Sequence, residues 1–133
     1  MAALDTNILV RYLVRDDARQ LALAKNLNGA AIHAGETLYV PVTVMLELEW
    51  VLRAGFALKK DQVISALASL LAAAELSFDS EAVVEIALAL YKNGAADFSD
   101  CVHIALAHAA GERPLWTFDR AAAKIAGARL LEA

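Results

Sequence analysis

Acidic residues next to apolar segments are the first candidates for catalysis or metal binding in this chain. Asp5 ends a short apolar run and is followed by Thr6 and Asn7. Several carboxylates that converge on one place cannot all stay ionised without cations. Oxygen ligands without a His or Cys cluster favour Mg²⁺ or Mn²⁺ over zinc. The residue types therefore predict a divalent-metal site, and its candidate acids are Asp5, Glu47, Asp97, Asp100 and Asp119.

Asp5 and Asp119 each follow a short apolar segment that we predict to be a strand. Open α/β folds bind ligands at the carboxyl ends of their strands, where the strand order reverses. In a doubly wound sheet the first and fourth strands flank that point, and both would end here in an aspartate. A plainer interpretation remains open, because each aspartate can also be the N-cap of the helix that follows.

Glu47 lies in a segment, 44–53, with apolar residues on all sides, so we predict a largely buried helix. Glu47 and Glu49 are two positions apart and point about 200° away from each other. Arg53 lies four residues after Glu49, which predicts an exposed ion pair. Glu47 has no cation at helical spacing. A buried carboxylate without a local partner is costly, so we predict that Glu47 is the functional one.

Asp97 and Asp100 are three residues apart at the start of a predicted helix, and this spacing puts them on one face. They can serve as an N-cap and a favourable first-turn acid, or they can hold a hard divalent cation. His103 is close enough to join them, although we favour a packed or supporting role. Cys101 has no histidine base at a suitable position and is predicted to be a core thiol.

The elements that position these acids alternate between strands and helices, without hairpin signals. This order predicts right-handed crossovers and one parallel sheet. No linker or repeat is visible, so we predict a single domain, 1–133. Thr6 or Asn7 is expected to cap the first helix, and Gly35 to end the second. The predicted strands are 2–5, 38–41, 76–78, 114–117 and 129–131; the predicted helices are 8–14, 18–34, 44–54, 60–74, 81–93, 98–110 and 121–126.

Composition narrows the function further. The chain has 133 residues, 59% of them hydrophobic, and a net charge of −4. This charge argues against nucleic-acid binding through a general basic surface, but not against acids gathered around metal ions. The sequence contains no run of about 18 apolar residues, so we predict no membrane span, and we expect no signal peptide. A single cysteine fits a reducing cytosol, so we expect a cytoplasmic protein. The lack of a glycine-rich phosphate loop excludes ordinary nucleotide hydrolases.

Four segments, taken together, resemble the PIN domain, and within it the VapC-type toxins of bacterial toxin–antitoxin pairs. The segments are Leu4–Leu9, Glu47-Leu48 with Val51-Leu52, Asp97–Asp100 and Thr117–Asp119. The resemblance covers essentially the whole chain. It implies an α/β fold with a five-stranded parallel sheet of order 3-2-1-4-5 between helices.

The resemblance also implies a metal-dependent endoribonuclease that uses Mg²⁺ or Mn²⁺. By position, Asp5, Glu47 and Asp100 match the core acidic triad. Asp119 matches the fourth acid and Asp97 a frequent additional one. The supporting positions, mostly hydroxyls that hold the acids or waters, are Thr6, Asn7, Ser99 and Thr117.

The partners implied by the resemblance are an RNA substrate, a cognate antitoxin and a second copy of the chain in a homodimer. The antitoxin is expected to supply a peptide, often with an arginine that reaches the acids. Apolar helix surfaces at 8–13 and 44–52 are candidates to receive it. The basic residues that we consider for RNA contact are Arg11, Arg15, Lys59, Lys60 and Arg120.

Two other functions stay open at this point. A metal-dependent phosphatase would use Asp5 as its nucleophile, but Asn7 stands where a second aspartate is expected. A catalytically silent PIN-like module would only bind RNA or a protein partner. The retained acids argue against such a module without proving turnover.

Overall fold

The computed structural model describes residues 2–132, which form two compact units. The first unit ends at Glu81 and the second begins at Ala82. In the described part of the chain all paired strands are parallel, which confirms the predicted α/β character. Each unit is described by itself below.

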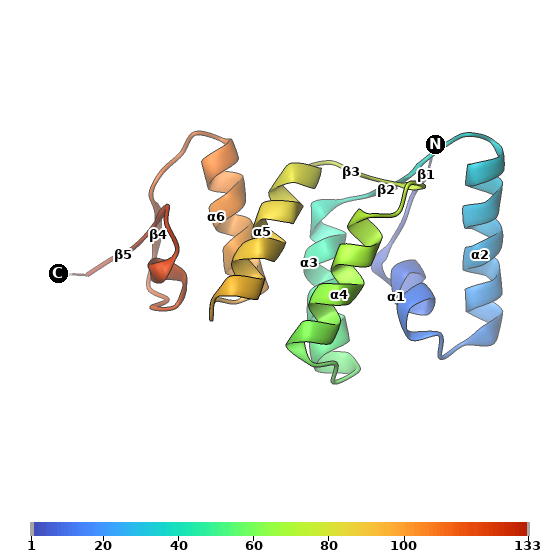
Figure 1. Cartoon of the computed structure of the whole chain (residues 1–133), viewed down its shortest axis with the longest axis horizontal. Coiled ribbons are helices and arrows are strands. Elements are labelled where there is room, and N and C mark those ends of the chain that lie inside the picture. Colours follow the sequence, from blue (N-terminus) through green and yellow to red (C-terminus); the bar gives the residue numbers. More distant parts are fainter. Residues whose placement is uncertain (1, 133) are drawn as a thin grey trace. The chain divides into compact units, whose positions relative to one another are not determined.

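The first unit is built on a three-stranded sheet of order β1-β2-β3, whose strands lie side by side in Figure 1. Ala2 pairs with Leu38, and Leu38 in turn pairs with Leu76. The pairing continues past β1, because the Leu4 N–H donates to the Tyr39 carbonyl at 2.8 Å. The strands are β1 (Ala2–Ala3), β2 (Leu38–Val40) and β3 (Leu76–Phe78).

Four α-helices and one π-helical turn complete the first unit. Helix α1 packs on α2 and α3, and α3 packs on α4, beside which it lies in Figure 1. The core between them contains fully buried aliphatic side chains such as Val40, Met45, Leu48 and Leu67. The helices are α1 (Thr6–Val14), α2 (Ala18–His33), α3 (Val42–Trp50), the π-turn η1 (Val51–Gly55) and α4 (Lys60–Leu71).

The helix ends in this unit follow local sequence rules, with one correction. Asp5 is the N-cap of α1, and its Oδ1 accepts from the Thr6 N–H at 2.8 Å. The prediction that Thr6 or Asn7 caps this helix is therefore wrong. Of Asp16 and Asp17, the two residues that the sequence offers for the start of α2, Asp17 is the N-cap and accepts from the Gln20 N–H. Gly35 adopts a φ of +70° directly after α2, a conformation that glycine adopts without strain.

The second unit contains two helices and a pair of parallel strands. The Tyr91 ring of α5 contacts the Phe98 ring of α6, with 5.4 Å between ring centroids. Strands β4 and β5 pair in a register that places Trp116 opposite Arg129, and a short 3₁₀ turn lies beside them (Figure 1). The elements are α5 (Glu81–Asn93), α6 (Phe98–Ala109), β4 (Leu115–Thr117), the 3₁₀ turn η2 (Ala122–Lys124) and β5 (Ala128–Leu130).

Two structural predictions are wrong. Residues 2–132 form a three-stranded and a two-stranded sheet in place of one five-stranded sheet of order 3-2-1-4-5. Each strand has only two or three residues, so it offers few backbone groups for a further ladder. The predicted helix at 121–126 is only the turn η2, because Gly127 has a φ of +97° and Ala128 already begins β5.

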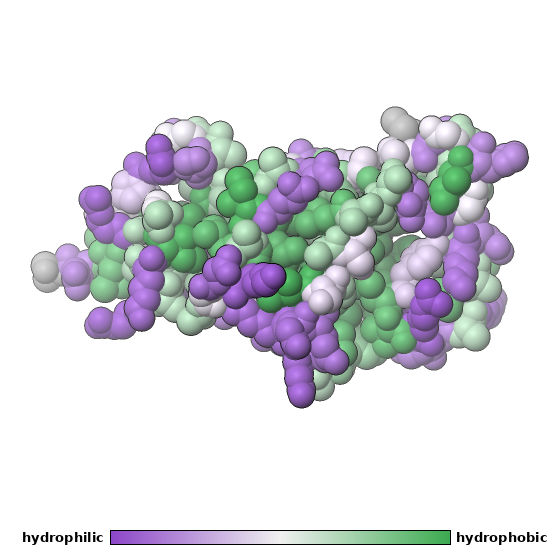
Figure 2. All heavy atoms as spheres, in the orientation of Figure 1, coloured by the Kyte–Doolittle hydropathy of each residue, from purple (hydrophilic) through white to green (hydrophobic). Residues whose placement is uncertain are grey.

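Hydrophobic side chains also reach the surface of the first unit. Leu23, Leu27 and Ile32 of α2 are exposed, and Figure 2 shows hydrophobic and hydrophilic side chains interspersed over this helix. Across residues 2–132, no helix combines the length and the apolar character needed to cross a bilayer.

Candidate active site

Asp97 and Asp100 occupy the first turn of α6 in the second unit. Asp97 is the N-cap residue by backbone conformation, with φ −63° and ψ 150°. Within residues 2–132, its carboxylate makes no capping hydrogen bond to this helix. Asp97 is thus in the cap position without using its side chain as a cap. The carboxylate keeps its acceptors for another ligand.

Asp100 is the residue with the clearest electrostatic signal. Burial raises the pKa of its carboxyl, and the negative charges of Asp119 and Asp97 raise it further, while His103 acts in the opposite direction. Asp119 and Asp97 therefore each repel an ionised Asp100. Such a cluster is stabilised by a cation or by protons.

Asp119 is held in place by two local hydrogen bonds. Its Oδ1 accepts from the Ala122 N–H at 2.8 Å, and its own N–H donates to the Thr117 hydroxyl at 3.0 Å. The Asp119 carboxylate thus bonds to the first residue of η2, but Ala121 is the N-cap residue, so the plainer interpretation of Asp119 as an N-cap is wrong. Thr117 holds the Asp119 backbone. Asp119 is exposed, and so is Ser99 in the first turn of α6.

Asp5, Thr6 and Asn7 lie at the start of α1 in the first unit. Asp5 and Asn7 are exposed, whereas Thr6 is only 2% exposed. The Thr6 hydroxyl oxygen is buried and finds no hydrogen-bond partner among residues 2–132. A buried hydroxyl without a partner is costly and commonly marks a place for water or an ion.

The two glutamates of α3 exchange the environments that were predicted for them. Glu47 is exposed, whereas Glu49 is only 4% exposed. The ion pair with Arg53 is confirmed, with Nε 2.8 Å and Nη2 3.4 Å from the Glu49 carboxylate oxygens. Glu49 is buried because it shares the helix face of Met45 and Leu52, and the half-exposed Arg53 side chain covers it.

This exchange allows a matched test within one helix. We expect Glu49→Gln to lower the free energy of unfolding by about 1.5–3 kcal/mol, because the buried partner of Arg53 loses its charge. We expect Glu47→Gln to change the same quantity by less than about 0.5 kcal/mol, because Glu47 is exposed. Urea denaturation of both variants measures this. Equal stability of the two variants would contradict the assignment of the buried carboxylate.

The donor chemistry of these acids fits a hard divalent cation. Asp97, Asp100 and Asp119 offer only oxygen, and the pKa of Asp100 is raised by burial and then by the charges of Asp119 and Asp97. Within residues 2–132, no three or more His, Cys, Asp or Glu side chains form a ready set of metal ligands. The residues thus fit such an ion in donor type and charge, although they are not arranged as a closed cage.

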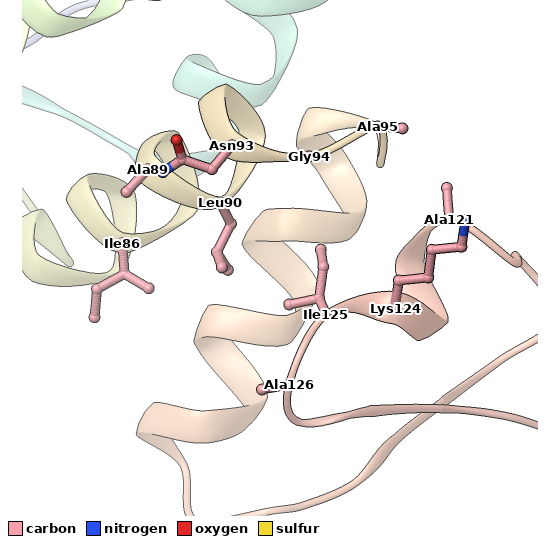
Figure 3. A pocket seen from close by; sticks show the side chains of 10 residues that line it. All are labelled: Ile86, Ala89, Leu90, Asn93, Gly94, Ala95, Ala121, Lys124, Ile125 and Ala126. Carbon is pink, nitrogen blue, oxygen red and sulfur yellow. The ribbon is translucent and has the colours of Figure 1, made fainter.

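A separate pocket of about 530 Å³ lies in the second unit, beside α5 and η2. Figure 3 shows Ile86, Leu90 and Ile125 around it, with Lys124 at one side. None of its lining residues, all within the described chain, is acidic. This pocket is therefore distinct from the acids described above.

Some of the basic residues considered for RNA contact form hydrogen bonds within the protein, and another is exposed. Arg11 bonds to Asp16 at 2.9 Å and to Gln20, and Arg15 donates to the Tyr12 carbonyl. Arg120 is exposed next to Asp119.

The sequence did not lead us to predict the exposed aromatic residues of the second unit, Trp116 and Phe118, or the contact of Arg129 with Trp116. We predicted 114–117 only as a short apolar strand that ends before an acid. The alternation of side chains along a strand is the pattern that would have predicted their exposure.

Comparison with known proteins identifies the family of this chain. A search of curated proteins finds no match. The family model of the PIN domain matches residues 2–128, which is nearly the whole sequence. The chain therefore belongs to the PIN domain family.

Proposed function

We propose that this protein is a Mg²⁺- or Mn²⁺-dependent endoribonuclease that hydrolyses RNA phosphodiester bonds. PIN domains are generally metal-dependent nucleases, which supports the class of reaction. The observation that carries the proposal is the placement of Asp97 and Asp100 in the first turn of α6, where burial and then the charges of Asp119 and Asp97 raise the pKa of Asp100. An acid cluster with this excess of charge suits a cation better than it suits solvent alone.

The residues that we propose as metal ligands are Asp5, Glu47, Asp97, Asp100 and Asp119, within one PIN domain of residues 1–133. A bound divalent ion supplies charge neutralisation of the phosphate and a lower pKa for a coordinated water. Glu47 is exposed and can orient the attacking water or accept its proton. Thr117 holds the Asp119 backbone in place, and Thr6, Asn7 and Ser99 are proposed to support the acids or their waters.

RNA cleavage with and without metal tests this function directly. We expect purified protein to cut a mixed cellular RNA preparation at discrete positions in Mg²⁺ or Mn²⁺ and to stop cutting in EDTA. We expect Asp5→Ala, purified identically, to cut at least about a hundredfold more slowly, because a ligand to the ion is worth several kcal/mol.

The variant also controls for a contaminating nuclease, which would cut equally in both preparations. An absence of metal-dependent cutting by folded wild-type protein would contradict the nuclease and favour a silent module that binds RNA or a partner. Capture of a phosphorylated Asp5 would favour the phosphatase.

We further propose that the nuclease is a VapC-type toxin of a toxin–antitoxin pair, acts in the cytoplasm and forms a homodimer. A cognate antitoxin peptide is proposed to bind the apolar helix surfaces of the first unit. A pocket of about 330 Å³ beside Ile8, Arg11 and Leu23, with the exposed Leu27 on its wall, supports this location. Apolar side chains in such a groove suit an amphipathic helical segment.

A further inference from the structure

We propose that Trp116, Phe118 and Arg129 form a stacking surface that holds unpaired bases of single-stranded RNA next to Asp119. This inference rests on the proposed endoribonuclease function. It adds a location for the substrate and a preference for unpaired strands.

The two aromatic residues lie on or directly after β4. Trp116 is 53% exposed, whereas its neighbours Leu115 and Thr117 are half-buried, as alternation along a strand requires. Phe118 follows the strand and is 79% exposed, more than any other large hydrophobic residue in 2–132. Leaving two aromatic rings two residues apart in the sequence exposed to solvent is costly, and exposed apolar patches commonly mark a binding surface.

Arg129 gives this surface a positive charge and a fixed ring. It lies opposite Trp116 in the β4–β5 pairing, and its Cζ is 5.5 Å from the Trp116 ring centroid. A guanidinium over an indole is a favourable cation–π contact. Arg129 is exposed, so it can contact a phosphate or a base while it holds the ring.

The chemistry of this surface favours RNA over an apolar peptide. Bases stack on aromatic rings and on arginine planes, and phosphates are attracted to arginine. The net charge of the chain is −4, and two other arginines are paired with acids, Arg11 with Asp16 and Arg53 with Glu49. Arg129 differs from these two, because it is exposed and lies over an exposed aromatic ring.

The position of the surface connects it with the proposed reaction. Asp119 directly follows Phe118 in the sequence and is fixed by Thr117 and Ala122. A base stacked on Phe118 would keep its backbone phosphate near the acids. Bases inside a duplex already stack on each other, so their faces are not available to the rings. The surface therefore selects unpaired segments.

Fluorescence quenching by an RNA strand tests the inference. The chain has two tryptophans, so Trp50→Phe leaves Trp116 as the only one. We would titrate this variant with short single-stranded oligoadenylate in EDTA, because stacking requires no metal and EDTA prevents cleavage. We expect quenching of Trp116, and much weaker binding of the same strand annealed to oligouridylate.

Substitutions then assign the contacts. We expect Trp116→Leu and Phe118→Leu each to weaken binding about tenfold, measured by anisotropy of a labelled strand. Trp116→Phe should retain most of the affinity, because it keeps an aromatic face. Trp50→Leu is the matched control, since Trp50 is 59% exposed on α3 and should leave the affinity unchanged. Thermal melting of each variant shows that it is folded.

Several outcomes would overturn the stacking surface. These are wild-type affinity in both leucine variants, equal binding of duplex and single strand, and a changed oligomeric state with unchanged RNA affinity. The last would assign the surface to a protein contact. Metal-dependent cleavage, measured on the same preparations, distinguishes the stacking surface from the nuclease.

If the wild-type protein cleaves RNA and Trp116→Leu binds RNA with unchanged affinity, the surface is rejected and the nuclease is not. If RNA stacks on the surface but the wild-type protein does not cleave it, the surface is supported and the nuclease is rejected.

Discussion

Asp100→Asn is expected to abolish RNA cleavage and, in the same protein without metal, to increase the free energy of unfolding. The Asp100 carboxyl has a raised pKa because of burial and of the charges of Asp119 and Asp97. Asparagine has almost the same size and removes the repulsion. It also removes a proposed metal ligand, so cleavage in Mg²⁺ should fall at least about a hundredfold.

The pH dependence gives this prediction a direction. The folded protein holds the Asp100 proton more tightly than the unfolded chain, whose carboxyl has its ordinary pKa of 3.8. The free energy of unfolding therefore falls as the pH rises from 3.8 through the raised pKa of the folded state. Above that pKa the ionised Asp100 destabilises the folded protein by its full amount. Urea denaturation in EDTA at several pH values measures this, and Asp100→Asn should lose that part of the pH dependence.

Metal binding supplies the second measurement on this variant. Wild-type protein should be stabilised by added Mg²⁺, because binding to the folded state shifts the unfolding equilibrium. Asp100→Asn should show much less of this stabilisation. Glu112→Gln, an exposed acid just after α6, is a matched control and should behave like wild type in all three assays. Undiminished cleavage by Asp100→Asn would reject its role as a ligand.

Phe98→Ala is expected to cause the largest loss of stability, about 3–5 kcal/mol. Phe98 is only 1% exposed, is the first residue of α6 and packs on Tyr91. Removing the ring leaves a cavity directly beside Asp97. Urea denaturation monitored by Trp116 fluorescence, in the Trp50→Phe background, measures the effect.

Phe98→Leu separates the loss of volume from other effects. It fills most of the space and should cost less than about 1.5 kcal/mol. Cleavage activity should follow the folded fraction, since Phe98 is not proposed to contact RNA. An alanine variant with the wild-type unfolding midpoint would show that Phe98 is not central to the second unit.

Much of the local structure was determined by the sequence itself. The spans of α5, α6, β2 and β3 are predicted within one or two residues, because apolar periodicity and glycine positions act over short distances. Asp17 and Gly35 mark the ends of α2 through hydrogen bonds and backbone conformation that involve only near neighbours. The parallel pairing follows from the alternation of strands and helices.

The candidate acids were also visible in the sequence, since residue type and position relative to strand and helix ends suffice to find them. The PIN family match over residues 2–128 agrees with the resemblance that those segments showed.

Only the tertiary structure decided which side of α3 faces the core. Apolar residues surround that helix, so its periodicity could not distinguish Glu47 from Glu49, and packing around Met45 and Leu52 buried Glu49. Tertiary structure likewise decided the burial of the Thr6 hydroxyl, the partial burial of Asp100 and its repulsion by Asp119 and Asp97. It also divided the strands between two sheets. Helix ends and turns depend on neighbouring residues, so the sequence by itself determined them. Burial, charge coupling and strand pairing depend on residues distant in sequence, so only the tertiary structure decided them.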